Sequence, residues 1–75
     1  MKLVELLPNQ TAKVVKLDIP DVRIKRRICD LGIFEGETVT FLKSSMLKKV
    51  VLVSVKNYVL CLKSSIAKSV EVQIG

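Results

Sequence analysis

The sequence has no histidine, no tryptophan and only two cysteines among its 75 residues. Cys29 and Cys61 lie far apart in the chain, which matches neither the close cysteine pairs of a zinc site nor the dense cysteine pattern of a small secreted domain. We therefore expect reduced thiols that act as small hydrophobic residues in or near the core. We expect no metal site and no cofactor.

Catalytic motifs are missing as well. The chain offers no histidine base, no serine in a strand-to-helix nucleophile turn and, with three glycines in all, no glycine-rich phosphate loop. Its carboxylates are scattered rather than paired. We predict that the protein is not an enzyme.

Aromatic residues make up only 4% of the chain, and we expect the core to take at least two of Phe34, Phe41 and Tyr58. Small barrels that bind single-stranded nucleic acid stack the bases on aromatic side chains. The net charge of +6 favours an acidic protein, an anionic lipid surface or a nucleic acid as partner. The shortage of aromatic residues weighs against the nucleic acid.

Long hydrophobic runs are absent too. The longest aliphatic run, Val50 to Val53, is far shorter than the ~18 residues that a membrane span needs. Near the N-terminus, Glu5 interrupts the leucines of residues 3–7, so the apolar core of a signal peptide is lacking. We expect a cytoplasmic protein without a membrane span.

What the chain does contain is enough apolar material for one small core. Hydrophobic residues make up 49% of the sequence and the mean hydropathy is +0.40, values that exclude a disordered chain. A chain of this length has room for a single domain, which we place over residues 1–75.

The region around Arg26 to Glu37 predicts a helix that ends in a tight turn. Ile24, Ile28 and Leu31 fall at i, i+4 and i+7, so they form one stripe on a helix and face a core. We expect the helix to begin after a cap at Asp18 or Asp21 and to stop at Leu31.

Two glycines follow this helix. Gly32 is expected to leave it with a positive φ in a Schellman cap, with Ile33 touching Ile28. Gly36 takes the third position of the turn over residues 34–37, which also needs a positive φ. We expect both glycines to be structural.

Alternating and β-branched segments predict five short strands. They cover Thr11 to Leu17, Thr38 to Lys43, Val50 to Val55, Tyr58 to Lys63 and Val70 to Ile74. Pro8-Asn9 and Lys56-Asn57 are expected to form tight turns, with Asn9 and Asn57 at positive φ. Ser64 to Lys68 is expected to form a single helical turn, and the leucines of residues 3–7 favour another.

Five strands with one inserted helix predict a mostly β fold, a small barrel of bent antiparallel sheet with a short helical turn before the last strand. The predicted core contains Val14, Ile24, Ile28, Leu31, Val39, Phe41, Leu60 and Val72.

The first candidate binding surface is on the helix. Arg23, Arg26 and Arg27 lie away from the apolar stripe, with Asp30 three and four residues beyond the last two. They form either a solvated face with weak ion pairs to Asp30 or a docking surface for an anionic partner.

The second candidate surface is the loop from Lys43 to Lys49, which carries Met46 and Leu47 where polar residues are usual. Either Leu47 tucks under the barrel, or the two apolar side chains contact a partner while Lys43, Lys48 and Lys49 steer the approach.

Several of these motifs together resemble the FeoA family, the small cytoplasmic component of bacterial and archaeal ferrous iron uptake. The matching segments are Leu3 to Leu7, Pro8-Asn9-Gln10, Ala12 to Leu17, Arg26 to Ile33, Gly36, Val59 to Lys63, Ala67 and Val70 to Val72. The chain departs from the family's pattern at Asn9, Glu35 and Lys63. Lys63 keeps the charge of the usual arginine but loses its planar fork.

The resemblance implies an SH3-like barrel that binds the cytosolic domain of a membrane ferrous iron transporter, FeoB, which recruits it to the inner face of the membrane. The alternatives are a nucleic-acid-binding barrel and a regulatory module like the SH3-like domain of metal-dependent repressors. The sequence leaves a weak homo-oligomer open.

Overall fold

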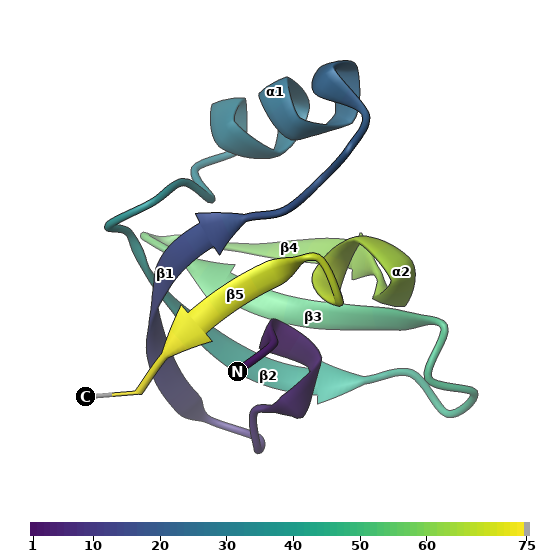
Figure 1. The fold of residues 1–75 in the computed structure, drawn as a ribbon. Helices are drawn as coiled ribbons and strands as arrows, with labels where there is room; N and C mark the ends of the chain where they lie inside the picture. Colours follow the sequence, from purple (N-terminus) through teal and green to yellow (C-terminus); the bar gives the residue numbers. More distant parts are fainter. Residues whose placement is uncertain (75) are drawn as a thin grey trace.

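Five strands make up one antiparallel sheet in the computed structural model, which describes residues 1–74 (Figure 1). They are β1 (Gln10–Leu17), β2 (Thr38–Ser44), β3 (Val50–Val55), β4 (Tyr58–Lys63) and β5 (Val70–Gln73). The 3₁₀ helix η1 (Leu3–Glu5) precedes them, α1 (Val22–Asp30) follows β1, and α2 (Ser64–Ala67) precedes β5. The expected order of strands and helices is confirmed.

The order of strands in the sheet is β4-β3-β2-β1-β5, which places β4 and β5 at the two edges. The register shifts between Val14 and Lys16 in β1 and between Phe41 and Lys43 in β2. Such bulges bend a strand and increase its twist. These two strands therefore curve, and the sheet wraps around the core as a small open barrel (Figure 1).

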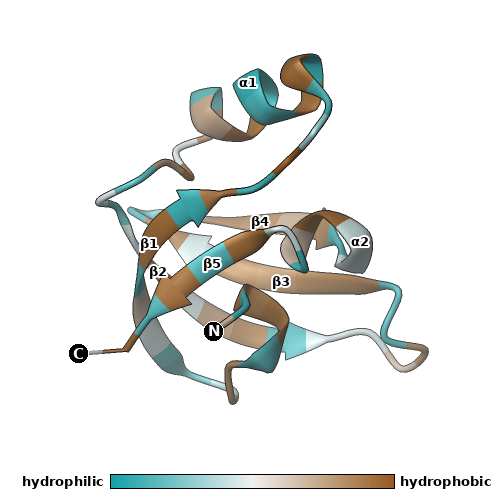
Figure 2. Ribbon diagram, in the orientation of Figure 1, coloured by the Kyte–Doolittle hydropathy of each residue, from teal (hydrophilic) through white to brown (hydrophobic). Residues whose placement is uncertain are grey.

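The core is made of alternate residues from the strands together with a few residues from the helices and connections. Figure 2 shows mostly hydrophobic strands beside an amphipathic α1. The buried residues are Leu3, Leu6, Ala12, Val14, Leu17, Ile19, Ile28, Ile33, Val39, Phe41, Val51, Val53, Val55, Leu62, Ala67, Val70 and Val72. Within residues 1–74 no polar or charged side chain is buried.

Three of the predicted core positions are wrong. Ile24 and Leu31 are each 38% exposed, and Leu60 is half-buried at the margin of the core. The whole helical stripe was expected to face the core, but α1 buries only Ile28. Ile33, beyond the end of the helix, is fully buried.

Both ends of α1 are capped by its own sequence. Asp21, not Asp18, is the N-cap, and its carboxylate accepts hydrogen bonds from the N–H groups of Arg23 and Ile24. At the other end the N–H of Gly32 donates to the carbonyl of Cys29 at 3.0 Å, and that of Ile33 to Ile28 at 3.1 Å. These two bonds make a Schellman cap, with Gly32 at φ 108°.

Of three predicted turns with a positive φ, two agree with the sequence and one differs. Asn9 has φ 67° and Gly36 has φ 94°, as their turns require. In the β3–β4 hairpin the positive φ, 55°, falls on Lys56 and not on Asn57. A type II′ turn needs a positive φ only at its first central residue, and the pairing of Val55 with Tyr58 makes Lys56 that residue.

Candidate functional site

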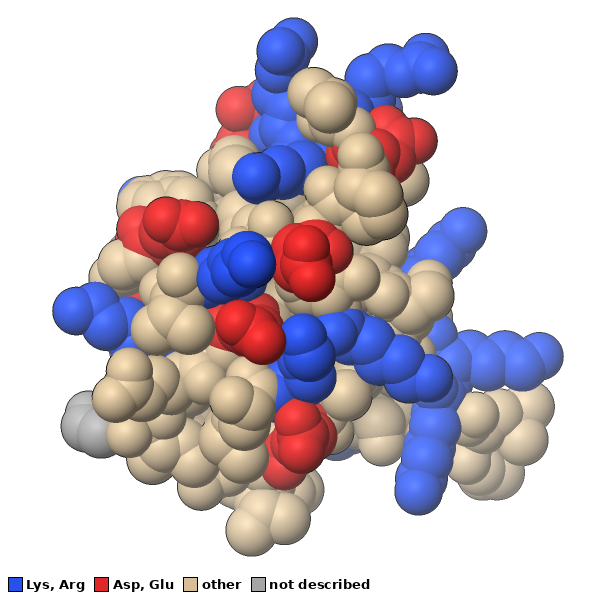
Figure 3. Space-filling model, in the orientation of Figure 1, with Lys and Arg blue, Asp and Glu red and all other residues tan. Residues whose placement is uncertain are grey.

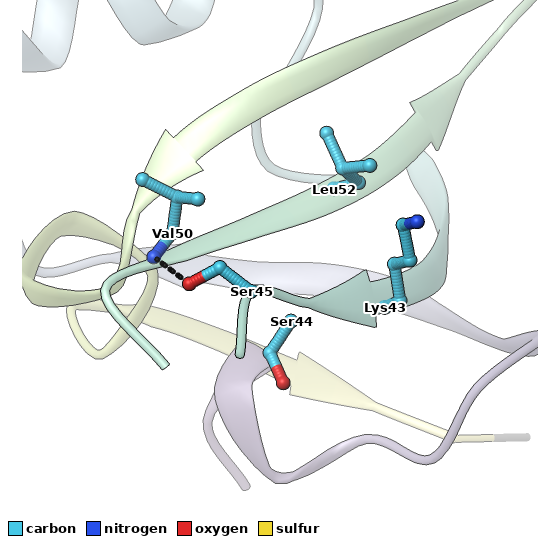
Figure 4. Close-up of a pocket in the computed structure, with 5 residues that line it drawn as sticks. All are labelled: Lys43, Ser44, Ser45, Val50 and Leu52. Carbon is cyan, nitrogen blue, oxygen red and sulfur yellow. Dashed lines mark hydrogen bonds between the residues drawn. The ribbon is translucent and has the colours of Figure 1, made fainter. Parts of the chain in front are cut away.

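The β2–β3 tip, residues 45–49, is a closed hydrogen-bonded turn. The Ser45 hydroxyl accepts hydrogen bonds from the N–H group of Lys49 at 3.0 Å and from that of Val50 at 3.3 Å, the second of which is drawn in Figure 4. The carbonyl of Ser45 accepts a hydrogen bond from the N–H group of Lys48 at 2.9 Å. Lys48 itself has a φ of 56°. The tip is therefore a defined structure and not an open loop. Because β2 continues to Ser44, Lys43 lies in the strand and not in the loop.

The two apolar side chains of the tip face solvent. Met46 is 97% exposed and Leu47 is 73% exposed. Leu47 therefore does not tuck under the barrel, which was the simpler of the two interpretations of this loop. Beside the tip, Lys43, Val50 and Leu52 line a shallow hollow of about 260 Å³ (Figure 4).

The base of the tip is held by the first residue of α2. The N–H of Ser64 donates to the carbonyl of Lys49 at 2.8 Å, and its hydroxyl donates to the carbonyl of Lys48 at 2.5 Å. On this side of the tip there is a second hollow, which Lys48 and Lys68 line together. Segments distant in the sequence thus bring further lysines to the tip.

The net charge of the protein comes from the part of the sequence that contains the β2–β3 tip. Residues 38–70 contain six lysines and no acidic residue, and elsewhere the seven acidic residues are balanced by seven basic ones. Figure 3 shows basic side chains projecting around the end of the molecule where the tip lies, and no acidic side chain beside them on the visible face. The charge of +6 is therefore a local feature.

Most of these lysines have no acidic partner. The ion pairs found within residues 1–74 are Lys2–Glu71 at 3.2 Å and Lys56–Glu37 at 3.9 Å. Lys56 also lies 5.6 Å from the ring centre of Phe34. The other five lysines of residues 38–70 are exposed, so their charge is available to a partner.

The arginine patch, Arg23, Arg26 and Arg27, is exposed on α1. The expected ion pairs with Asp30 are not formed within 4.0 Å in the described chain. The patch lies at the end of the molecule away from the β2–β3 tip (Figure 1). The structure thus keeps the two candidate surfaces apart.

A third surface was missed by reasoning from the sequence. Ile24 and Leu31 of α1 face Cys61 and Ile66 across a groove of about 320 Å³. Cys61 is exposed on the edge strand β4, so its expected place near the core is wrong, whereas Cys29 packs against the core. The sequence did contain one indication of this groove, because β4 carries apolar residues on both of its faces.

Tyr58 ties the end of α1 to the sheet. Its hydroxyl donates to the carbonyl of Leu31. A Cβ atom at Gly32 would lie 2.7 Å from the Tyr58 oxygen and 3.2 Å from Val55 Cγ1. The position after the helix therefore needs glycine for space as well as for its φ.

No group of three or more histidine, cysteine or acidic side chains is close enough to hold a metal ion in the part of the chain described. The pKa of Glu71 is lowered, first by the hydrogen bond from Lys2 and then by the charge of that lysine. Glu71 is half-buried on β5, and this interaction joins the N-terminal segment to that strand.

None of the helices within residues 1–74 is long and apolar enough to cross a membrane.

Comparison with family models matches the FeoA domain over residues 1–74. The chain belongs to the FeoA family. FeoA proteins are non-enzymatic accessory proteins related to ferrous iron transport, which confirms the expected absence of enzymatic activity. Comparison with curated protein sequences gives no significant match.

Solved structures support the same assignment. Stenotrophomonas maltophilia FeoA complexed with zinc, described as an SH3 domain protein, is 30% identical, with 97% of this chain and 89% of that one covered and a TM-score of 0.82. Chlorobium tepidum FeoA is 27% identical, with 99% and 70% covered and a TM-score of 0.92. The expected SH3-like fold is confirmed.

A manganese-dependent transcriptional repressor also matches, at 18% identity and a TM-score of 0.88. The aligned region covers 97% of this chain but 35% of the repressor. At this identity the likeness shows the fold alone.

Proposed function

We propose that this FeoA protein is a cytoplasmic accessory protein that binds the cytosolic part of the ferrous iron transporter FeoB and is recruited by it to the inner face of the membrane. Membership of the FeoA family supports a role beside the transporter. The observation that carries a binding role is the exposure of Met46 and Leu47 on a hydrogen-bonded tip surrounded by unpaired lysines.

The two candidate surfaces would contribute in different ways. Lys43, Lys48 and Lys49 are exposed charges that steer association, and this contribution weakens with salt. Met46 and Leu47 lose contact with water on binding, so they slow dissociation. The arginine patch on α1 offers planar donors for carboxylates on a protein partner.

The test is the kinetics of binding to FeoB reconstituted in a lipid bilayer, with the same bilayer lacking FeoB as the reference. Wild type is expected to bind the FeoB bilayer more than the reference. Lys48→Glu with Lys49→Glu should slow association and flatten its salt dependence. Met46→Ser with Leu47→Ser should speed dissociation.

Matched variants separate these effects from general changes in charge and polarity. Lys13→Glu with Lys16→Glu makes the same change of charge on β1, and Leu7→Ser with Val15→Ser removes exposed apolar groups elsewhere. All four double variants should melt within a few degrees of wild type. Binding no stronger to the FeoB bilayer than to the reference would refute the proposed function.

The contribution of the arginine patch has its own test. Reversing Arg23, Arg26 and Arg27 to glutamate should weaken binding to FeoB. If tip variants bind like wild type and the arginine variant does not, the patch alone is the contact. If the arginine variant also binds like wild type, neither candidate surface is the contact.

A further inference from the structure

We propose that the β2–β3 tip binds the anionic surface of a lipid bilayer, with Met46 and Leu47 in the headgroup layer and the lysines around them on lipid phosphates. This inference rests on the proposed function for placing the protein beside the membrane. It deepens that function by assigning the tip to lipid, which leaves the arginine patch for the transporter itself.

The shape of the tip favours a fluid interface. It is the convex end of a hairpin that projects from the molecule (Figure 1), and Met46 and Leu47 at this end are 97% and 73% exposed. A protein partner would need a matching cavity for each of them. The headgroup layer accommodates apolar side chains at the end of a hairpin without such a match.

The charge around the tip complements an anionic leaflet. Lys43, Lys48 and Lys49 flank it, the pairing of Lys63 with Val50 places another lysine at its base, and Lys68 shares a hollow with Lys48. Residues 38–70 contain no acidic side chain that would repel lipid phosphates. Near an anionic membrane each basic residue strengthens binding by about fivefold.

The kind of basic residue also fits lipid. All the basic residues of this half of the chain are lysines, whose ammonium groups act as point charges on flexible stems and suit phosphates without a fixed arrangement. A nucleic acid partner would instead favour aromatic side chains among the basic ones. The tip has none.

Apolar insertion and basic charge reinforce each other. A pair of exposed apolar side chains holds a protein at a membrane only weakly, and stable attachment needs a second contribution such as a basic patch. The tip combines the two. Because α1 lies at the other end of the molecule (Figure 1), a protein attached through the tip keeps its arginine patch free.

Vesicle flotation without any transporter tests the proposal. Wild type should bind vesicles of equal parts phosphatidylglycerol and phosphatidylcholine and should not bind phosphatidylcholine alone. Lys48→Glu with Lys49→Glu should weaken binding by about tenfold or more, and Met46→Ser with Leu47→Ser by several-fold. Lys13→Glu with Lys16→Glu, which changes the net charge equally, should weaken it less than the tip pair.

Insertion of the apolar side chains has a separate readout. The chain has no tryptophan, so Met46→Trp adds a single probe whose emission should shift to the blue on phosphatidylglycerol vesicles. Leu7→Trp, 67% exposed in the wild type, is the matched control and should not shift.

Three results would overturn the assignment of the tip to lipid. They are no binding of wild type to the anionic vesicles, equal losses of binding for the two lysine pairs, and no emission shift for Met46→Trp.

If tip variants change binding to FeoB bilayers but not to vesicles, the tip contacts the transporter protein and the proposed function stands. If vesicles bind the protein as well as FeoB bilayers do, the lipid contact stands and the proposed function fails.

Discussion

At the scale of residues, Ile28 connects α1 to the rest of the fold. It is 4% exposed and is the only buried residue of the helix, while Ile24 on the same stripe is 38% exposed. A helix with a single fully buried side chain depends strongly on that side chain, although Cys29 also packs against the core. The two isoleucines therefore form a matched pair for measuring what the attachment contributes.

Ile28→Ala should lower the free energy of unfolding by ~2–5 kcal/mol, because it removes buried methylene groups and leaves a cavity. Ile24→Ala should cost less than about 1 kcal/mol, because its side chain is already partly hydrated. Urea denaturation of both variants measures the difference. Equal losses for the two would contradict the packing of α1 described above.

Gly32 is constrained twice, by its φ of 108° and by the lack of space beside Tyr58 and Val55. Gly36 has a φ of 94°, but a Cβ atom added there would meet nothing within 4 Å. Gly36→Ala should therefore cost about 1 kcal/mol from backbone strain alone. Gly32→Val should cost more, because strain and collision with Tyr58 add. Thermal melts should show this order, and a Gly32→Val protein that melts like wild type would refute the role of the cap.

Residues differ in how well the sequence predicts them. Gly32 and Asn9 are of types that favour a positive φ, so their places could be inferred without the structure. Lys56 has no such preference, and the sequence offers no sign that it takes this conformation in the hairpin. The stripe of Ile24, Ile28 and Leu31 predicted which face of the helix looks inward, but periodicity does not say how closely a helix approaches a sheet.

At the scale of elements, strands were the easiest part to predict. The bounds of β3 and β4 agree with the alternation of the sequence, and β2 and β5 differ by one residue. The order of the strands in the sheet cannot be predicted in this way, because alternation within a strand does not say which strands pair. The groove between α1 and β4 was missed because it depends on β4 being at an edge and on α1 standing away from the core.

The N-terminal segment is joined to β5 by both backbone and side chains. Val72 and Met1 exchange hydrogen bonds at 2.8 and 3.2 Å, and Lys2 pairs with Glu71. The pKa of Glu71 in the folded protein is below its ordinary value of 4.5. Its contribution to stability is present above the pKa of the unfolded chain and is lost as the pH falls through the pKa of the folded state.

Glu71→Gln should therefore lower the melting temperature slightly at neutral pH, and the difference from wild type should disappear in acid. Because both side chains of the pair remain partly exposed to solvent, the effect is small. Glu35→Gln, which removes an exposed carboxylate outside these ion pairs, serves as the control and should show no such pH dependence. Melting curves across the acid range measure both, and a difference for Glu71→Gln that grows toward low pH would contradict this account.

At the scale of the whole molecule, the set of possible metal ligands decides what this chain can bind. FeoA from Stenotrophomonas maltophilia was crystallised as a complex with zinc. The present chain has no histidine, and its described residues bring no three metal ligands together. Zinc sites in proteins are usually completed by four ligands of these types.

We therefore predict no tight binding of zinc or ferrous iron in a reducing buffer. Isothermal titration calorimetry should show no stoichiometric site with a Kd below micromolar, and replacing both Cys29 and Cys61 by serine should leave the titration unchanged. A stoichiometric site that disappears in this double variant would show that the two thiols bind metal.

Fold and family could be inferred from the sequence because the turns, the helix end and the strands each leave a local pattern. The gathering of charge in space could not, because five of the six lysines of residues 38–70 come together at the tip end through the pairing of β2, β3 and β4 and through α2, while Lys56 lies in the β3–β4 turn and pairs with Glu37. The position of a functional surface depends on such pairings, whereas the existence of the strands does not.

The weak attachment of α1 also has a consequence for dynamics. The helix is an insertion between β1 and β2, and its links to the rest of the fold are Ile28, the half-buried Cys29, the Schellman cap and the Tyr58 hydroxyl. We therefore expect it to unfold while the sheet stays intact, which is a sub-global opening. Amide protons near its C-terminal end should exchange with deuterium faster than those of β3, and Tyr58→Phe should accelerate exchange in α1 alone.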